Sequence, residues 1–150
     1  ISKTMISFMQ KKIDRVKLAK PIEIINDNIL NVNRTGQYDM VMANYFLNVF
    51  RRDMMLQILT HLCTCVKPGG SMVIGDLALP KEGNFFYRAF QKTYWYLAAT
   101  LYSITADNSV HPIYDYPDLL KSLGFEIAEI KYFRIFGMKC HWSVRGVKKA

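Results

Sequence analysis

Helical periods and short apolar runs alternate along the first third of the chain. Over Ser2 to Val16 the apolar residues recur about every 3.6 positions, which predicts an amphipathic helix with Ser2 or Thr4 as its capping hydroxyl. Ile22 to Ile25 is a short β-branched run closed by turn-forming residues, and it predicts a strand. Tyr38 to Asn44 is almost unbroken apolar sequence, typical of a strand buried on both faces of a parallel sheet.

The middle of the chain predicts a helix, a turn and another buried strand. Asp53 to Val66 follows the helical period, and its core candidates are Met54, Leu56, Ile58, Leu59 and Leu62. Lys67 to Gly70 is expected to end this helix in a turn, because proline and glycine interrupt regular structure. Ser71 to Gly75 is then a second short apolar strand.

An aromatic helix and a strand hairpin follow. Asn84 to Tyr102 predicts a long helix and Tyr116 to Leu123 a short one. Phe125 to Phe133 predicts a strand, and Lys139 to Val147 is expected to pair with it antiparallel. Helices that alternate with apolar strands and close in a hairpin indicate an α/β domain with a mostly parallel sheet.

The long aromatic helix has two dissimilar sides. One side follows the helical spacing of a core face, with Phe86, Phe90, Tyr94, Leu97 and Leu101. The opposite side mixes aromatic, basic and amide groups, namely Arg88, Gln91, Lys92, Trp95 and Tyr102. Such a mixture suits a membrane interface or a lid over an apolar aromatic substrate.

Composition narrows the class of protein. With 150 residues, of which 51% are hydrophobic, the chain has material for one domain and is not a disordered segment. Charged and polar residues interrupt its apolar stretches before the roughly 20 residues that a membrane-spanning helix needs. Neither a signal peptide nor a linker is predicted. Because the first residue is Ile1 and not methionine, we expect the sequence to begin inside a longer chain.

The cysteines and charges exclude some chemistry. Cys63, Cys65 and Cys140 are odd in number and lack zinc spacing, so we expect reduced, packed thiols and no metal site. The net charge of +8 includes a basic cluster, which is interpreted as a solvated helix face: Lys11, Lys12, Arg15, Lys17 and Lys20. No aromatic platforms accompany that cluster, so nucleic-acid binding is not predicted.

Several motifs, in order, resemble class I S-adenosylmethionine-dependent methyltransferases over essentially the whole chain. Tyr38 to Val41 looks like the family's fourth strand, and Val66 to Ser71 resembles its "L-K-P-G-G" turn before strand five. Gly124 and Phe125 resemble its "aGF" entry to strand six. The resemblance implies a Rossmann-like methyltransferase sheet in strand order 3, 2, 1, 4, 5, 7, 6.

The resemblance also implies which residues bind S-adenosylmethionine. Ile1, Ser2 and Met5 fit the stretch that follows the acidic end of strand two in the family. Asp27, Asn28 and Ile29 fall at its adenine loop, where a polar side chain accepts from the adenine amino group and Ile29 packs on the ring. Three residues after strand four would face the methionine part and the acceptor: Asn44, Tyr45 and Phe46.

Two hallmarks of the family are missing from this sequence. No glycine-rich GxGxG loop is present, and the acid that should end strand two is absent. The implied sheet would therefore lack its first strands, which leaves unpaired backbone at a strand edge. We expect an upstream segment or a second chain to complete the sheet, and poor cofactor affinity without it.

The implied layout has three parts. Residues 1–83 carry cofactor-side elements, residues 84–118 a substrate-cover insertion and residues 119–150 the closing strands. In the insertion we expect Tyr87, Arg88 and Trp95 to contact substrate, and His111 and Tyr114 to be catalytic candidates. An imidazole is suited to removing a phenol proton before methyl transfer, because its pKa lies near working pH.

Three functions stay open at this point. One is methyl transfer to a small, lipophilic aromatic or quinone-like acceptor, since the aromatic cover is similar to the quinone-biosynthesis branch. The others are rhodoquinone-type amino transfer from S-adenosylmethionine and a noncatalytic methyltransferase-like partner subunit. Free thiols fit the cytosol or an organelle matrix, and the basic and aromatic surfaces permit peripheral membrane contact.

Overall fold

In a computed structural model, the chain divides into two compact units, Ile1–Asn33 and Arg34–Ala150. The structure describes residues 3–16, 21–79, 85–106, 113–135 and 137–149. The first unit contains helix α1 (Lys3–Ile13) and a 3₁₀ turn, η1 (Ile29–Asn31). The strand predicted at Ile22 to Ile25 is wrong, because these residues have no regular structure. β-branched residues alone do not make a strand without a neighbouring strand to pair with.

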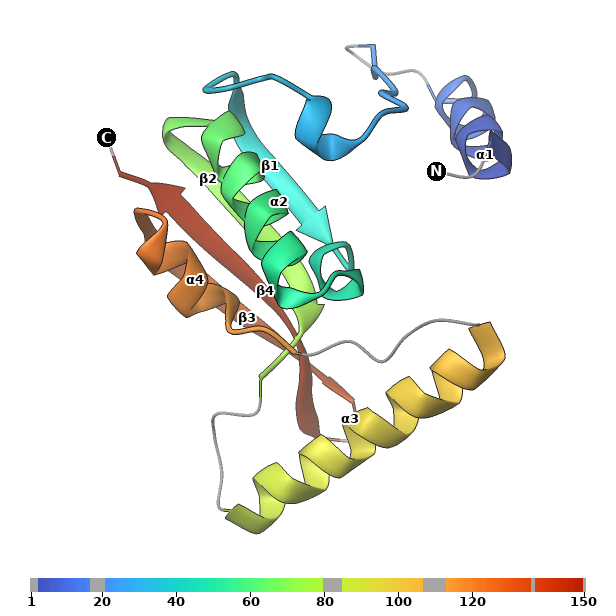
Figure 1. Cartoon of the computed structure of the whole chain (residues 1–150), viewed down its shortest axis with the longest axis vertical. Helices are drawn as coiled ribbons and strands as arrows, with labels where there is room; N and C mark the ends of the chain where they lie inside the picture. The colour runs from blue at the N-terminus through green and yellow to red at the C-terminus, as the bar shows by residue number, and fades with distance from the viewer. Residues whose placement is uncertain (1–2, 17–20, 80–84, 107–112, 136, 150) are drawn as a thin grey trace. The chain divides into compact units, whose positions relative to one another are not determined.

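The second unit is built on a four-stranded sheet (Figure 1). Its strands are β1 (Tyr38–Asn44), β2 (Val66–Leu77), β3 (Phe125–Ile135) and β4 (Met138–Lys148). The spatial order is β1-β2-β4-β3, with β1 and β2 parallel and the other two pairs antiparallel. This is the order 4, 5, 7, 6 of the expected sheet, so the predicted Rossmann-like α/β class with a closing hairpin is confirmed.

Two helices, α2 (Arg52–Cys65) and α4 (Tyr116–Ser122), lie on the same face of the sheet (Figure 1). Helix α2 packs on β1 and β2, and α4 packs on β3 and β4. Of the core candidates in α2, Ile58, Leu59 and Leu62 are buried, whereas Met54 is exposed and its neighbour Met55 is buried instead. The core between helices and sheet also contains Met72, Ile74, Tyr116, Leu120, Phe125, Trp142 and Val144.

The predicted turn at Lys67 to Gly70 is instead the beginning of β2. The register shifts here, so that Tyr38 pairs with Val66 whereas Met40 pairs with Ser71. The extra residues bulge out of the strand, and Gly69 takes a positive φ of 73°. Proline and glycine therefore mark an irregular strand entry, which local sequence does not distinguish from a turn.

The face of the sheet opposite α2 and α4 is open in the described part of the chain. Tyr38, Met40 and Met42 project from β1 on this face, and Met42 is 58% exposed. Strand β1 pairs with β2 alone among the described strands, so its other edge is also free. The expectation that this strand is buried on both faces is wrong within the second unit, because no described element of that unit covers these residues.

Helix α3 (Phe85–Ala106) lies beyond the carboxyl ends of β1 and β2 (Figure 1). Its predicted orientation is wrong: Phe86 and Phe90 are 79% and 64% exposed, whereas Gln91 and Trp95 are 2% and 8% exposed. The Gln91 amide donates to the Lys139 carbonyl at 2.7 Å. Helical spacing identifies which residues share one side of a helix, but not which side faces the sheet. Both sides of α3 contain aromatic residues, so the sequence does not decide between them.

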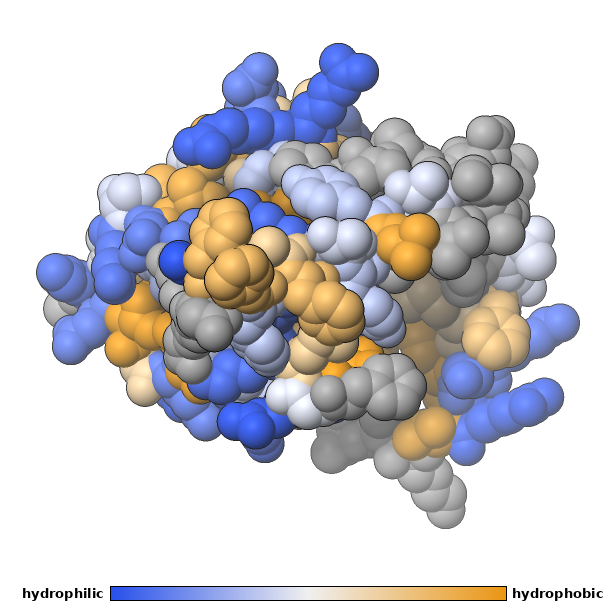
Figure 2. Space-filling view, turned by 90° about the horizontal axis from the view of Figure 1, so that it is seen from below, coloured by the Kyte–Doolittle hydropathy of each residue, from blue (hydrophilic) through white to orange (hydrophobic). Residues whose placement is uncertain are grey.

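Trp95 packs in a small core with Met138 and Cys140, joined by Leu77, Tyr94 and Ile113. The other side of α3 leaves apolar side chains on the surface, which gather on the side of the molecule seen in Figure 2. Within the described residues, no helix is both long and apolar enough to cross a membrane.

The close approach at Gly70 gives a test of the bulge. A Cβ there would lie 2.9 Å from the Asp39 carbonyl oxygen, so we expect Gly70→Ala to lower the free energy of unfolding by about 1–3 kcal/mol. Gly69→Asn is the matched control, because its site is open and asparagine tolerates a positive φ. Urea unfolding followed by circular dichroism measures both, and equal effects would contradict the bulge geometry.

Candidate functional site

The carboxyl ends of β1 and β2 bring Asn44 and Gly75 side by side. The Asn44 side chain lies directly over Gly75, since a Cβ on that glycine would be 2.5 Å from Asn44 Oδ1. Asn44 is exposed, and its amide nitrogen donates to the Met42 sulfur at 3.2 Å. A sheet with this topology forms its ligand crevice at such strand ends, so an amide is presented where a ligand would bind.

Tyr45 follows Asn44 and has a strained backbone. Its φ is +46°, the only positive φ at a non-glycine residue in the described part of the chain. The Tyr45 amide donates to the Gly75 carbonyl at 2.8 Å, which holds this conformation. This backbone conformation directs the Tyr45 side chain across the end of β2 towards β4. The Tyr45 hydroxyl lies 2.9 Å from His141 Nδ1. Strain of this kind concentrates at functional sites.

His141 is held among aromatic rings. Its ring meets those of Trp95 and Tyr45 edge to face, with centroids 5.6 and 5.8 Å apart. Burial lowers the pKa of His141, so the imidazole is neutral at neutral pH. Burial and the negative charge of Asp76 raise the pKa of Tyr45, so the phenol keeps its proton. The pair is a neutral imidazole joined to a protonated phenol.

Asp76 follows Gly75 along β2 and has a different environment from the phenol–imidazole pair. It is buried, and it accepts from the Tyr116 hydroxyl at 2.6 Å and from the Leu77 amide at 2.7 Å. Burial raises the pKa of this carboxyl, and the hydrogen bonds from Tyr116, Leu77 and Asn48 oppose the shift. Asn48 belongs to the 3₁₀ turn η2 (Leu47–Val49). Asp76 therefore ties the end of β2 to the start of α4 and to η2.

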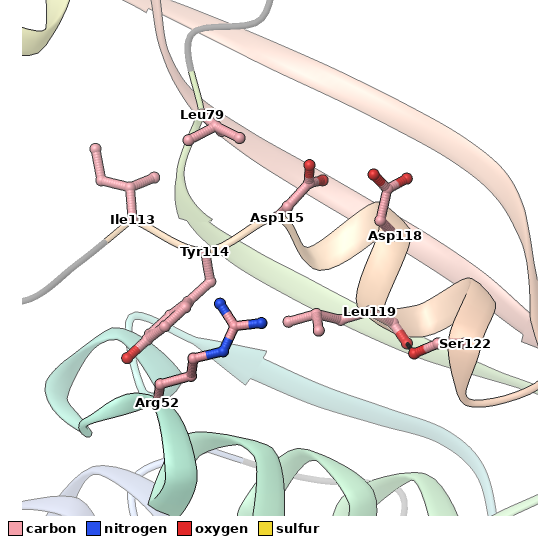
Figure 3. Close-up of a pocket in the computed structure, with 8 residues that line it drawn as sticks. All are labelled: Arg52, Leu79, Ile113, Tyr114, Asp115, Asp118, Leu119 and Ser122. Carbon is pink, nitrogen blue, oxygen red and sulfur yellow. Dashed lines mark hydrogen bonds between the residues drawn. The ribbon is translucent and has the colours of Figure 1, made fainter.

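A pocket of about 460 Å³ opens where the beginnings of α2 and α4 come together (Figure 3). Arg52 reaches between Tyr114 and Leu119, and Asp115 and Asp118 line the same pocket (Figure 3). The Tyr114 hydroxyl donates to the Phe50 carbonyl at 2.8 Å, and burial raises its pKa. The pocket does not include Tyr45 or His141, so this pocket and the phenol–imidazole pair are separate features.

The expected cofactor residues fall in both units. In the first unit, the Asp27 carboxylate accepts from the Asn28 amide at 2.6 Å and from Asn31 Nδ2 at 2.9 Å. Asn28 caps η1 by accepting from the Leu30 amide, and Ile29 is half-buried. These polar atoms stabilise a local turn. Ile1 and Ser2 lie outside the described residues, as does the side chain of Met5.

The remaining expected residues are in the second unit. Asn44 and Tyr45 meet at the strand ends as described, whereas Phe46 is half-buried and packs on Phe50 with centroids 5.3 Å apart. Tyr87 and Arg88 are exposed on α3, whereas Trp95 is buried. His111 lies outside the described residues.

His141 is the functional candidate that the sequence did not indicate. It belongs to an alternating strand in which its neighbours Cys140 and Trp142 are buried. The sequence shows His141 only as a polar residue in an alternating strand, and such residues are common in sheets. Its contact with Tyr45 joins residues 96 positions apart and depends on the register of two strand pairs. Within the described residues, no group of three or more His, Cys, Asp or Glu is arranged to hold a metal ion.

Comparison with solved structures places the fold among methyltransferases. A methyltransferase-like protein from Bacillus halodurans C-125 matches with a TM-score of 0.71 and 11% identity, over 100% of this chain and 81% of that one. Magnesium protoporphyrin IX methyltransferase from Synechocystis PCC 6803, solved with bound S-adenosylmethionine, gives a TM-score of 0.63 and 15% identity, over 99% and 57%.

A third structure has a named acceptor. 1,6-Didemethyltoxoflavin-N1-methyltransferase from Burkholderia thailandensis, with its acceptor and S-adenosylhomocysteine bound, matches with a TM-score of 0.59 and 13% identity, over 100% of this chain and 58% of that one. The chain spans about half the length of several of these methyltransferases. No protein-family model and no curated protein matches the sequence. The likeness shows a class I methyltransferase fold.

The environment of Asp76 gives a test by pH. Because its pKa is raised in the folded state, the stability that its protonation contributes is present below about pH 4 and is lost as pH rises through the raised pKa. We expect Asp76→Asn to remove this loss, since an amide stays neutral. Urea midpoints measured from about pH 3 to 8 check it.

Tyr116→Phe provides the contrasting variant. It deletes the hydrogen bond that lowers the pKa of Asp76, so the loss of stability should move to higher pH. It should also cost about 1–3 kcal/mol, because a buried carboxylate oxygen loses its partner. An unchanged pH profile in both variants would show that Asp76 has an ordinary pKa in the folded protein.

Proposed function

We propose that the protein catalyses S-adenosylmethionine-dependent methyl transfer to a small acceptor. The observation that carries the proposal is the arrangement at the strand ends of a methyltransferase-like sheet, with Asn44 over Gly75 and the strained Tyr45 beside them. The neighbours solved with S-adenosylmethionine or S-adenosylhomocysteine support the choice of cofactor. When bound, that cofactor supplies an electrophilic methyl group.

The residues at the strand ends fit such a ligand. Gly75 leaves room for the Asn44 side chain, and the exposed Asn44 amide offers both donor and acceptor groups to the methionine part. Tyr45 and Phe46 are the further candidates at this edge, and Asp27, Asn28 and Ile29 are those for adenine. The chain's task is to align donor and acceptor, because in-line geometry supplies much of the rate enhancement.

We infer that a further strand pairs with the free edge of β1 and that its segment supplies the glycine-rich loop. The exposed side chains of Met40 and Met42 support this, since a central strand of such a sheet is normally covered. The segment belongs either upstream of these residues or to a second chain.

The acceptor we propose is lipophilic and aromatic or quinone-like, with Tyr87, Arg88 and Trp95 of α3 as its cover. Aromatic side chains concentrate where α3 meets β4, which supports an apolar ring as the acceptor. His111 and Tyr114 remain catalytic candidates in this proposal. Tyr114 would first have to release the Phe50 carbonyl.

S-adenosylhomocysteine binding tests the proposed function directly. The protein purified from its native source is titrated by calorimetry, and we expect binding that Asn44→Ala weakens about tenfold, the equivalent of one lost hydrogen bond. Gln57→Ala, another exposed amide, is the matched control on α2. Absence of binding by the wild-type protein would favour a noncatalytic partner subunit and refute the enzyme.

Helix α3 also supports peripheral membrane contact, from which a lipophilic acceptor would be drawn. Phe86 and Phe90 are largely exposed, and Leu97 lies on the same side of the helix. The helix has no acidic residue, and Arg88 and Lys92 are also exposed. Exposed aromatic rings on a basic helix are typical of segments that lie in a membrane interface.

Vesicle binding checks this contact. We expect the protein to cosediment with phosphatidylcholine–phosphatidylglycerol vesicles, and Phe86→Ser with Phe90→Ser to weaken partitioning more than about tenfold, because each buried ring contributes about 1.5–3 kcal/mol. Phe133→Ser removes an exposed ring from β3 and serves as control. Equal partitioning of the two variants would rule out α3 as the contact.

A further inference from the structure

We propose that Tyr45 and His141 form a proton-accepting pair that ionises a hydroxyl group of the acceptor during methyl transfer. This inference rests on the proposed function and narrows its acceptor to an aromatic hydroxyl compound. It begins from the contact between the Tyr45 hydroxyl and His141 Nδ1, 2.9 Å apart at the carboxyl edge of the sheet.

The backbone is shaped to make this contact. Strand β2 lies between β1 and β4, so Tyr45 must cross roughly 10 Å, two strand spacings, to reach His141. The left-handed conformation of Tyr45 and its amide hydrogen bond to Gly75 direct the phenol across that distance. A non-glycine residue takes this conformation at a cost, so the surrounding structure favours the pair over a relaxed backbone.

The surroundings of the pair suit proton transfer. Trp95 of α3, Leu77 of β2 and Phe133 of β3 adjoin His141, and none of them carries a charge. Asp76 is the charged group that acts on Tyr45, and its carboxylate disfavours a phenolate. Since a phenolate is disfavoured, the proton is expected to pass through Tyr45 and to rest on His141.

In this step the acceptor loses a proton to the pair and gains a methyl group. The acceptor O–H bond breaks and its proton moves to the Tyr45 oxygen, while the Tyr45 proton moves to Nδ1 and gives an imidazolium. The acceptor oxygen forms a bond to the methyl carbon as the carbon–sulfur bond breaks, and that electron pair stays on sulfur. His141 then returns its proton to water, and the pair is restored.

The pair selects a class of acceptor. A neutral imidazole removes a proton more readily from an aromatic hydroxyl or an enol than from an aliphatic alcohol, because the first two are far more acidic. The edges of Trp95 and Tyr45 at His141 provide aromatic surface for a ring. An amine acceptor, by contrast, would already be nucleophilic and would not need the pair.

A chromogenic phenol tests the proposal without knowledge of the natural acceptor. 4-Nitrophenol, whose phenolate is yellow, is added to the native-source protein saturated with S-adenosylhomocysteine, and absorbance is recorded against pH. We expect bound nitrophenol to ionise at a pH at least one unit below that of the free compound. His141→Gln and Tyr45→Phe should each abolish this shift, whereas His61→Gln on α2 should keep it.

The outcomes separate this proposal from the proposed function. If the wild-type protein binds S-adenosylhomocysteine but nitrophenol fails to bind or ionises as in water, or if the shift persists in either variant, the proton-accepting pair is refuted and the methyltransferase stands. If S-adenosylhomocysteine does not bind the wild-type protein, the proposed function itself has failed. Unchanged circular dichroism spectra and urea midpoints of His141→Gln and Tyr45→Phe show that both variants fold.

Discussion

The parallel pairing of β1 with β2 is the constraint on which the candidate site depends. It brings both carboxyl ends to one edge and sets Asn44 beside Gly75, and the next residue closes the pairing with its amide hydrogen bond to Gly75. Strand β4 then joins the other side of β2 and adds His141 to the same edge. The local sequence around Tyr45 or His141 therefore does not bring the two side chains together. The pairing of β1 and β4 with β2 does.

The two faces of this sheet have different roles. One face packs on α2 and α4 and contains the apolar core, while the other exposes methionines of β1 in the described part of the chain. A sheet with one covered face is stable when the open face is polar, yet the β1 part of this face exposes the apolar side chains of Met40 and Met42. That contradiction is the physical reason to expect a further segment on this face, and it is independent of any likeness to known proteins.

Much of the fold was predictable because its elements carry strong periodic signals. The bounds of α2, β1 and α4 follow from apolar periods that end at charges, glycine or polar turns. The orientation of α3 was not predictable, since Phe90 and Trp95 are both plausible anchors and the choice depends on what Trp95 meets in β4. His141 was missed for the same reason: a contact between distant strands follows from register, and a one-residue change in register would turn the imidazole to the other face.

Alternation along β2 explains why the acid at its end is a structural group while its neighbours form the site. Gly75 and Leu77 project to the open face, whereas Asp76 projects to the helix face and bonds Tyr116 there. A carboxylate at the end of a strand in this fold is a natural candidate for a catalytic group. The strand pleat, however, turns the Asp76 side chain away from the ligand crevice. Its influence reaches the site through charge, by keeping the Tyr45 proton in place. Asp76 is thus a positioning residue for the pair, and the face on which a polar side chain lies matters more than its distance along the strand.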